Sequence, residues 1–206
     1  MYNINRVIKK LTPHRSAAEL FKYFSDEKDC VFLDSSLVNG LGRYSIIGMR
    51  PYLKLVKDDH GFFINEQKVS ELSFEEYLKK YLSEHEDQNK SGLSMLSGAI
   101  GYFSYEYGRK LMEIPSHKEN LVTIPDAVLV FYDMYIIEDC HEKKTFLVAN
   151  GVTEDAEKLI ESVEKRLTEV LLEKEQVADG SFNIEITPNF KKEEYKQAVD
   201  EMIRYI

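Results

Sequence analysis

Three polar side chains at the end of an apolar run are the residues of this sequence best suited to bind a ligand. The run CVFL ends directly in Asp34, Ser35 and Ser36, and a loop with two glycines follows. One interpretation is a turn at a strand end, where Asp and Ser side chains hydrogen bond to the nearby backbone. The other is a small polar pocket, in which Asp34 would hold an ammonium group and Ser35 would supply a hydroxyl. The residue types alone do not decide between these two interpretations.

The loop after these residues would form the second half of such a pocket. The backbone of residues 40–44, which include Leu41, Gly42 and Tyr44, would close over the ligand. Arg43 would bind a carboxylate, because its guanidinium matches two carboxylate oxygens. A zwitterion such as an amino acid would suit this set. A structural ion pair is the alternative for Arg43.

No catalytic motif accompanies this cluster. The sequence has neither the phosphate-binding G-x-x-x-x-G-K-[ST] motif nor a G-x-G-x-x-G turn between a strand and a helix. None of the five histidines stands at ligand spacing to another His, a Cys or a carboxylate, so we expect solvated side chains and no metal site. The acidic runs at 71–76 and 154–164 are expected to be helix surfaces. We therefore predict no catalytic residue in this chain.

The elements around Cys30–Lys57 must position the polar cluster. Gly48 is expected to stop a strand and Pro51 to make a turn, because both residues weaken a sheet interior. After a turn at Asp58–Gly61, the segment 61–66 is expected to return as a hairpin partner. Three strands are predicted before that turn, at about 30–35, 43–48 and 52–58.

The remaining chain alternates between helical and strand-like patterns. Ser16 with Glu19, and Ser73 with Glu76, form capping boxes that begin helices. Together these patterns predict an α+β fold with a large, mostly antiparallel sheet or sheets flanked by helices. The expected elements are a strand at 5–12, helices at about 16–25 and 73–84, a strand and short helix within 95–114, a long central strand at 127–139, its hairpin partner at 145–150, a long helix capped by Thr153, a short strand within the connector 173–189, and a helix in the last segment, 189–206.

Composition narrows the class of protein. The chain has 206 residues and a net charge of −9 without a basic cluster, which argues against nucleic acid and anionic membranes as partners. No apolar run approaches the roughly 18 residues of a membrane span, and the N-terminus does not resemble a signal peptide. Cys30 and Cys140 are expected to be buried, reduced thiols. We therefore expect a cytoplasmic protein.

The last segment bears on domain organisation. Its apolar residues keep helical spacing up to Ile206, without a glycine or proline stop. We expect the chain to be cut inside this helix, whose apolar face would need a partner. The predicted domains are 1–175 and, as a connector and first helix of another domain, 176–206.

Four motifs occur in an order and at a spacing that resemble one family. They are FLDSS with GRYSIIGMRP (32–51), LSGAIGYFSYEYGRKLMEIP (96–115), IPDAVLVFYDMYIIED (124–139) and NFKKEEYKQAVDEM (189–202). Over essentially the whole chain they resemble the N-terminal region of component I of the chorismate-using synthases. These are the aminodeoxychorismate (para-aminobenzoate) synthases and the anthranilate synthases. The family fold, with large antiparallel sheets flanked by helices, agrees with the α+β prediction.

The resemblance implies that the chemistry takes place outside these residues. Members of the family bind chorismate and Mg²⁺ in a C-terminal domain, and a separate glutamine amidotransferase subunit supplies ammonia. No catalytic or metal-binding residue is implied here, so the chain alone is expected to be inactive. The expected partners are the amidotransferase subunit and the chain's own C-terminal domain.

The resemblance also gives the polar cluster a ligand. The N-terminal domain of the family carries a tryptophan pocket, which is regulatory in anthranilate synthases and structural in some aminodeoxychorismate synthases. The positions of this chain that match it, with one adjacent residue, are Ser35, Leu41, Gly42, Arg43, Tyr44 and the neighbouring Asp34.

Two details favour the para-aminobenzoate branch. The segment GRKLMEIP resembles that branch more closely, and Phe32-Leu33-Asp34-Ser35 stands where the anthranilate pattern has Leu-Leu-Glu-Ser. The expected function is the non-catalytic N-terminal portion of aminodeoxychorismate synthase component I, in folate biosynthesis. The alternatives are the same portion of an anthranilate synthase, with tryptophan feedback, and a stand-alone small-molecule binding domain.

Overall fold

The computed structural model describes residues 5–115, 123–172 and 185–206. The chain forms two compact units, Met1–Glu173 and Lys174–Ile206, and each is described by itself. The domain boundary predicted at 175/176 lies outside the described residues. So does most of the segment in which a short connector strand was predicted.

An antiparallel sheet is the centre of the first unit. Within the described residues it has eight strands, in the order β1-β8-β7-β3-β4-β5, with β2 also pairing with β3 and β6 with β7. This arrangement confirms the predicted α+β fold. The strands are β1 (Val7–Leu11), β2 (Val31–Leu33), β3 (Tyr44–Asp58), β4 (Gly61–Ile64), β5 (Gln67–Val69), β6 (Ala99–Phe103), β7 (Ala127–Asp139) and β8 (Lys144–Ala149). The helices are α1 (Ala17–Phe21), α2 (Phe74–Glu84), α3 (Tyr105–Leu111), α4 (Ala156–Leu172) and, in the second unit, α5 (Lys192–Tyr205).

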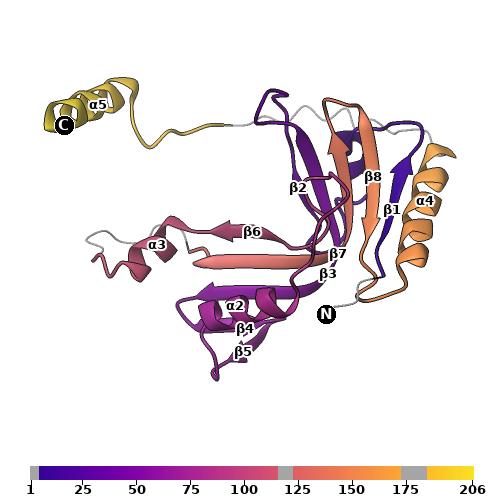
Figure 1. Cartoon of the computed structure of the whole chain (residues 1–206). Coiled ribbons are helices and arrows are strands. Elements are labelled where there is room, and N and C mark those ends of the chain that lie inside the picture. The colour runs from indigo at the N-terminus through magenta and orange to yellow at the C-terminus, as the bar shows by residue number, and fades with distance from the viewer. Residues whose placement is uncertain (1–4, 116–122, 173–184) are drawn as a thin grey trace. The chain divides into compact units, whose positions relative to one another are not determined.

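The long strands β3 and β7 join two halves of the sheet (Figure 1). In the first half, residues 44–49 of β3 pair with residues 134–139 of β7, next to β2, β8 and β1. In the second half, residues 53–57 of β3 pair with residues 127–131 of β7, next to β4, β5 and β6. Because β3 and β7 run through both halves, the two halves belong to one continuous sheet.

The predicted stop at Gly48 and turn at Pro51 are wrong, because both residues lie inside β3. Gly48 is needed for packing, since a Cβ there would lie 2.8 Å from the Tyr132 ring. Pro51 lacks an N–H, and a β-bulge between Pro51 and Leu53 accommodates it. Arg50 next to it has a φ of 57°. Proline within a sheet is typically confined to such bulges and to edges.

Helices cover one face of each half. In the first half, α1 and α4 place Leu20, Leu159 and Ile160 against Met134 and Ile136 of β7. Apolar residues at helical spacing in α4 make this contact possible, because they form one stripe along the helix. All five side chains are almost completely buried.

Helix α2 covers the second half through aromatic contacts. The ring of Phe74 meets Phe62 of β4 edge-on, with centroids 5.5 Å apart. Phe74 also contacts Phe103 and Tyr107 edge-on, at 6.2 Å each. The ring of Phe74 therefore packs α2 against β4, β6 and α3 at once.

Both predicted capping boxes mark the start of a helix, but only the one at Ser73 is complete, since the Glu19 carboxylate accepts from Arg15 and not from Ser16 N. The Ser73 hydroxyl accepts from Glu76 N at 3.1 Å, and Ser73 N donates to Glu76 Oε2 at 2.9 Å. Ser16 accepts from Glu19 N at 3.2 Å. The helix after Ser16 is shorter than predicted and ends at Phe21, because the following turns use i→i+3 bonds.

The predicted cap at Thr153 is wrong. Its hydroxyl donates to the buried carboxylate of Asp133 at 2.6 Å. The side chain of Asp155 caps α4 instead, accepting from Glu157 N at 3.1 Å and Lys158 N at 3.2 Å. An acidic side chain suits this position, because the N-terminus of a helix carries partial positive charge.

His14 is not the solvated surface side chain that we expected. Its Nε2 lies 3.0 Å from Oε1 of Glu138, a buried residue of β7. The other carboxylate oxygen accepts from Ala17 N at 2.7 Å, at the start of α1. The pair therefore anchors the segment before α1 to the sheet.

Burial of the cysteines was predicted correctly for Cys140 but not for Cys30. Both are free, Cys140 is buried and Cys30 is half-buried. Burial raises the pKa of Cys30 to about 11, so this thiol stays protonated at neutral pH. Among the described helices, none is both long and apolar enough to cross a membrane.

Candidate functional site

The predicted polar cluster lies at one end of the sheet. β2 pairs with residues 46–48 of β3, so the chain leaving β2 meets the start of β3 again after the loop. Asp34 and Ser35 therefore come beside Tyr44 and Ser45. The structure brings together residues from both sides of the loop, as the sequence predicted.

Ser35 fastens the loop to β3 by two hydrogen bonds. Its hydroxyl donates to the Tyr44 carbonyl at 2.7 Å, and its backbone N–H donates to Ser45 Oγ at 3.0 Å. The buried Ser45 hydroxyl in turn donates to Asp34 Oδ1 at 3.2 Å and lies 3.6 Å from the Cys140 sulfur. The turn interpretation therefore describes Ser35, whereas Asp34 keeps an exposed carboxylate at the edge of the loop.

Arg43 forms the structural ion pair that the sequence left open. Its Nε and Nη2 donate to Oδ2 of Asp139, at 3.0 and 2.6 Å, and its guanidinium lies over the Tyr44 ring at 4.9 Å. Asp139 also accepts from the backbone N–H groups of His141 and Glu142 at 3.1 and 3.0 Å. The Arg43 guanidinium, with these N–H groups, lowers the pKa of the Asp139 carboxyl. A ligand carboxylate would have to share this guanidinium with Asp139.

A side chain not singled out from the sequence shapes the loop. Asn39 Oδ1 accepts from Leu41 N at 2.8 Å and from Gly42 N at 2.9 Å, and its carbonyl lies 3.1 Å from His141 Nε2. Gly42 is required here, because a Cβ would lie 2.3 Å from the Leu37 carbonyl oxygen. The Asn-Gly pair at 39–40 is the sequence signal from which this turn could have been predicted.

The outer side of the loop is apolar. Leu41 is 98% exposed, and three neighbours are also exposed: Leu33, Leu37 and Val38. Leu41 thus stands apart from the polar residues that were predicted beside it. The site offers a carboxylate, a partly exposed guanidinium and apolar side chains, which suit an amphipathic zwitterion.

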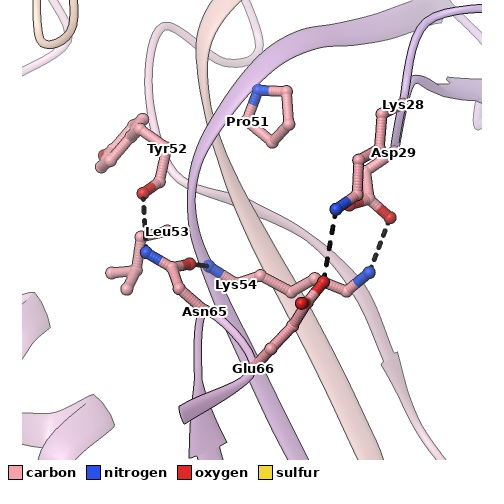
Figure 2. Close-up of a pocket in the computed structure, with 8 residues that line it drawn as sticks. All are labelled: Lys28, Asp29, Pro51, Tyr52, Leu53, Lys54, Asn65 and Glu66. Atoms are coloured by element: carbon pink, nitrogen blue, oxygen red, sulfur yellow. Dashed lines mark hydrogen bonds and ion pairs between the residues drawn. The ribbon is translucent and has the colours of Figure 1, made fainter.

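A separate cavity of about 320 Å³ lies at the bulge of β3 (Figure 2). Across it, Lys54 Nζ lies 2.6 Å from Asp29 Oδ1 and Lys28 Nζ lies 3.3 Å from Glu66 Oε1. None of the predicted site residues lines this cavity, and its charged groups are paired with one another. The lining residues are Lys28, Asp29, Pro51, Tyr52, Leu53, Lys54, Asn65 and Glu66.

Asn65 bridges two backbone groups beside this cavity. Its Oδ1 accepts from Lys54 N at 2.8 Å, and its Nδ2 donates to the Tyr52 carbonyl at 3.3 Å. The amide therefore satisfies one backbone group inside the bulge and one just after it, where the ladder of β3 is interrupted. Within the described ranges, no group of three or more His, Cys, Asp and Glu side chains could hold a metal ion, here or elsewhere.

Comparison with known proteins shows the family. A family profile described as chorismate binding enzyme matches residues 29–206. Anthranilate synthase component 1 of Acetivibrio thermocellus is 28% identical over 207 residues, covering 91% of this chain and 42% of that protein. The component 1 of Lactococcus lactis is 28% identical over 127 residues, covering 60% and 28%.

A solved structure shows the same fold. Anthranilate synthase component I from Streptococcus pneumoniae TIGR4 matches with a TM-score of 0.61 and 20% identity, over 98% of this chain and 45% of that chain. The chain thus spans less than half the length of each of these relatives. The profile covers most of the chain, and the motifs at 32–51, 96–115, 124–139 and 189–202 lie inside that match. The chain therefore belongs to the chorismate binding enzyme family.

Proposed function

We propose that this chain is the non-catalytic N-terminal portion of an aminodeoxychorismate synthase component I, which aminates chorismate to 4-amino-4-deoxychorismate for folate biosynthesis. Family membership over residues 29–206 supports the chorismate chemistry. The catalytic site with its Mg²⁺ is proposed to lie in the further length that the relatives have. The described residues fit no such ion, since they contain no cluster of three metal-ligating side chains.

The anthranilate branch is the second candidate, because the matched relatives carry that name. The para-aminobenzoate branch rests on Asp34 where the anthranilate pattern has glutamate, and on the segment 108–115. The reaction product distinguishes the two branches. A chain of the relatives' length, given chorismate, ammonia and Mg²⁺, is expected to form aminodeoxychorismate. Formation of anthranilate would move the assignment to the other branch.

The 206-residue chain by itself is expected to be inactive. Among the described residues, no group of three or more His, Cys, Asp and Glu side chains could hold a metal ion. Incubation of the purified chain with chorismate, ammonia and Mg²⁺ should leave chorismate unchanged. Aminated product from this chain alone would contradict the proposal that it is non-catalytic.

A glutamine amidotransferase subunit is the proposed partner of the full-length enzyme. The subunit would supply ammonia, so glutamine should replace added ammonia only when that subunit is present. Product formation from glutamine by component I alone would contradict this part of the proposal. A stand-alone binding domain is the third hypothesis. It would gain support if chains of the relatives' length did not use chorismate at all.

Tryptophan is the proposed ligand of the loop at 34–44. Asp34 would bind the ammonium, Arg43 would share its guanidinium between Asp139 and the ligand carboxylate, and the backbone at Leu41 and Gly42 would lie beside the ring. Titration calorimetry with the full-length enzyme should show binding that Asp34→Asn weakens about tenfold or more, because the charged hydrogen bond is lost.

A matched control for this titration is Glu66→Gln. It also removes an exposed carboxylate, but at the cavity of the β3 bulge rather than at the loop. Tryptophan affinity should be unchanged in this variant. Equal weakening by both variants would show that overall charge, and not the loop, governs binding.

A further inference from the structure

The cavity at the β3 bulge gathers charged side chains from three separate segments. Lys28 and Asp29 precede β2, Lys54 belongs to β3, and Glu66 lies in the turn between β4 and β5. Figure 2 shows the charged ends of these four side chains pointing toward one another at the cavity. Charged side chains on a protein surface are usually turned out into solvent. Their convergence on one hollow is therefore a feature that a ligand site would explain.

The inner of the two ion pairs at the cavity is half-buried and fixed in place. Lys54 Nζ lies 2.6 Å from Asp29 Oδ1, and the two side chains are 30% and 25% exposed. The carbonyl of Asp29 accepts from the Tyr132 hydroxyl at 2.7 Å, which holds this residue against β7. Among the described residues, no hydrogen-bond donor reaches the second carboxylate oxygen of Asp29. The pair thus keeps an acceptor, and further N–H groups of Lys54, for a molecule in the cavity.

The outer ion pair can open at little cost to the fold. Lys28 Nζ lies 3.3 Å from Glu66 Oε1, and both side chains are 78% exposed. Two long side chains that are this exposed lose conformational freedom when they pair, so their ion pair contributes little to stability. Each side chain can therefore turn and bind a ligand group of opposite charge. The outer pair would then admit a ligand while the inner pair stays in place.

The remaining wall of the cavity is apolar and is fixed by the bulge. Pro51 and Leu53 line it, and Leu53 is only 7% exposed. Asn65 binds the backbone of Tyr52 and Lys54, so the shape of this wall is set before any ligand arrives. The volume of about 320 Å³ is at the lower end of the roughly 300–1,000 Å³ of small-molecule pockets. The cavity therefore suits a small ligand with a short apolar part.

The balance of charges selects the kind of ligand. The cavity offers two ammonium groups and two carboxylates, so the net charge of its lining is zero. A ligand with a single charge would be attracted by two of these groups and repelled by the other two. A zwitterion places each of its charges beside two groups of opposite sign, and its hydrogen bonds to them are charge-assisted. The lining thus favours a molecule that has both an ammonium group and a carboxylate.

We propose that the cavity at the β3 bulge binds an α-amino acid with a short aliphatic side chain. The ligand ammonium lies between Asp29 and Glu66 in this arrangement. The ligand carboxylate lies between Lys28 and Lys54, and the aliphatic side chain lies against Leu53 at the apolar wall. Saturable binding in the millimolar range is expected, because a ligand of this size makes only a few contacts.

A titration of the 206-residue chain with L-valine, followed by NMR of the backbone amides, tests the proposal. Saturable shifts are expected at residues 28–29, 52–54 and 65–66. Isovalerate and isobutylamine keep the apolar part of valine but carry only one of its two charges, so each should bind about tenfold more weakly or less. Absence of saturable shifts with valine would overturn the proposal. Equal binding of the three compounds would refute the selection for a zwitterion.

Two variants show whether valine binds in this cavity. Glu66→Gln removes a carboxylate from a side chain that is 78% exposed, so the fold should be unchanged while valine binds about fivefold more weakly. Lys54→Gln removes the inner ammonium and should weaken valine binding about tenfold or more, with circular dichroism to verify that the variant is folded. Unchanged valine affinity in the folded variants would refute the proposed contacts.

Asp34→Asn is the matched control, because it removes an exposed carboxylate from the loop at 34–44. The cavity shares no residue with that loop and does not depend on the function proposed for it. Valine affinity should therefore be unchanged in Asp34→Asn, just as tryptophan affinity should be unchanged in Glu66→Gln. Equal weakening of valine binding by both variants would place the amino acid elsewhere and refute the site at the bulge.

Discussion

The two ends of β7 each hold an exposed apolar segment in place through a carboxylate and a cation. At one end, Asp139 binds Arg43 and fixes the loop at 34–44. Just before the other end, Asp126 binds Lys110 and fixes α3. Both carboxylate side chains are only 8% exposed. In each case, a buried aspartate fixes the cation of an exposed apolar segment.

The two ends of β7 differ in how far the position of the apolar segment depends on the cation. Asp139 also receives two backbone N–H groups, so it keeps hydrogen bonds without Arg43. Lys110 binds both oxygens of Asp126. The loop is also held by Ser35 and Asn39. Helix α3 is also held by Tyr107, by its aromatic contacts and by the Ser104 N–H, which donates to the Asp126 carbonyl at 2.7 Å. The two backbone N–H groups on Asp139 should therefore make the loop more tolerant of substitution than the α3 end.

Among the substitutions that test this difference, Gly101→Ala at the α3 end is expected to destabilise the protein most. A Cβ on Gly101 of β6 would lie 1.8 Å from the Val128 carbonyl oxygen, so β6 would have to separate from β7. We expect a loss of about 3 kcal/mol or more, measured by urea unfolding. Gly40→Ala serves as the control, since its Cβ would meet no atom within 4 Å. A loss of less than about 1 kcal/mol would show that β6 shifts easily.

Lys110→Met should have the next largest effect. The buried Asp126 carboxylate would lose its charged donor, while the methionine keeps much of the apolar stem of the side chain. Because Lys110 is partly exposed, we expect about 1–2 kcal/mol of destabilisation rather than the full cost of a buried unpaired charge. An unchanged urea midpoint would mean that the α3 end is as redundant as the loop.

Gly42→Ala tests the tolerance of the loop end. Its Cβ would lie 2.3 Å from the Leu37 carbonyl oxygen, but Leu37 belongs to an exposed loop that can move. We expect about 1 kcal/mol of destabilisation, well below that of Gly101→Ala. Equal losses in the two variants would contradict the difference between the two ends.

The smallest expected effect concerns pH and Arg43. Arg43 lowers the pKa of Asp139 below its ordinary 3.8, so the pair stabilises the fold above that pH and loses this contribution as acid protonates Asp139. Arg43→Met should therefore flatten the fall in stability on acidification below about pH 4. Urea midpoints followed from neutral to acidic pH measure this slope. Identical slopes would show that the backbone N–H groups alone set the pKa of Asp139.

Much of the fold was predictable from local patterns. The capping box at Ser73, the long apolar run of β7 and its hairpin with β8 depend on residues close in sequence, and all three are confirmed. The polar end of β2 was also predictable, because Asp34 and Ser35 interrupt an apolar run. The shortened α1 and the cap of α4 were missed, since neighbouring residues offered equally suitable bonds.

The sequence by itself determined most of the strands, the cap at Ser73 and the position of the polar loop, because these depend on spacing within a few residues. Only the tertiary structure decided the partner of Arg43, which stands 96 residues away in Asp139. It also decided that β3 continues past Gly48 and Pro51, since the Tyr132 ring and the bulge that permit this come from non-local pairing. The exposure of apolar side chains on α3 was decided in the same way. Distant Asp126 and Glu75 bind the polar side of the helix, and no periodicity within seven residues reveals which side such partners will hold.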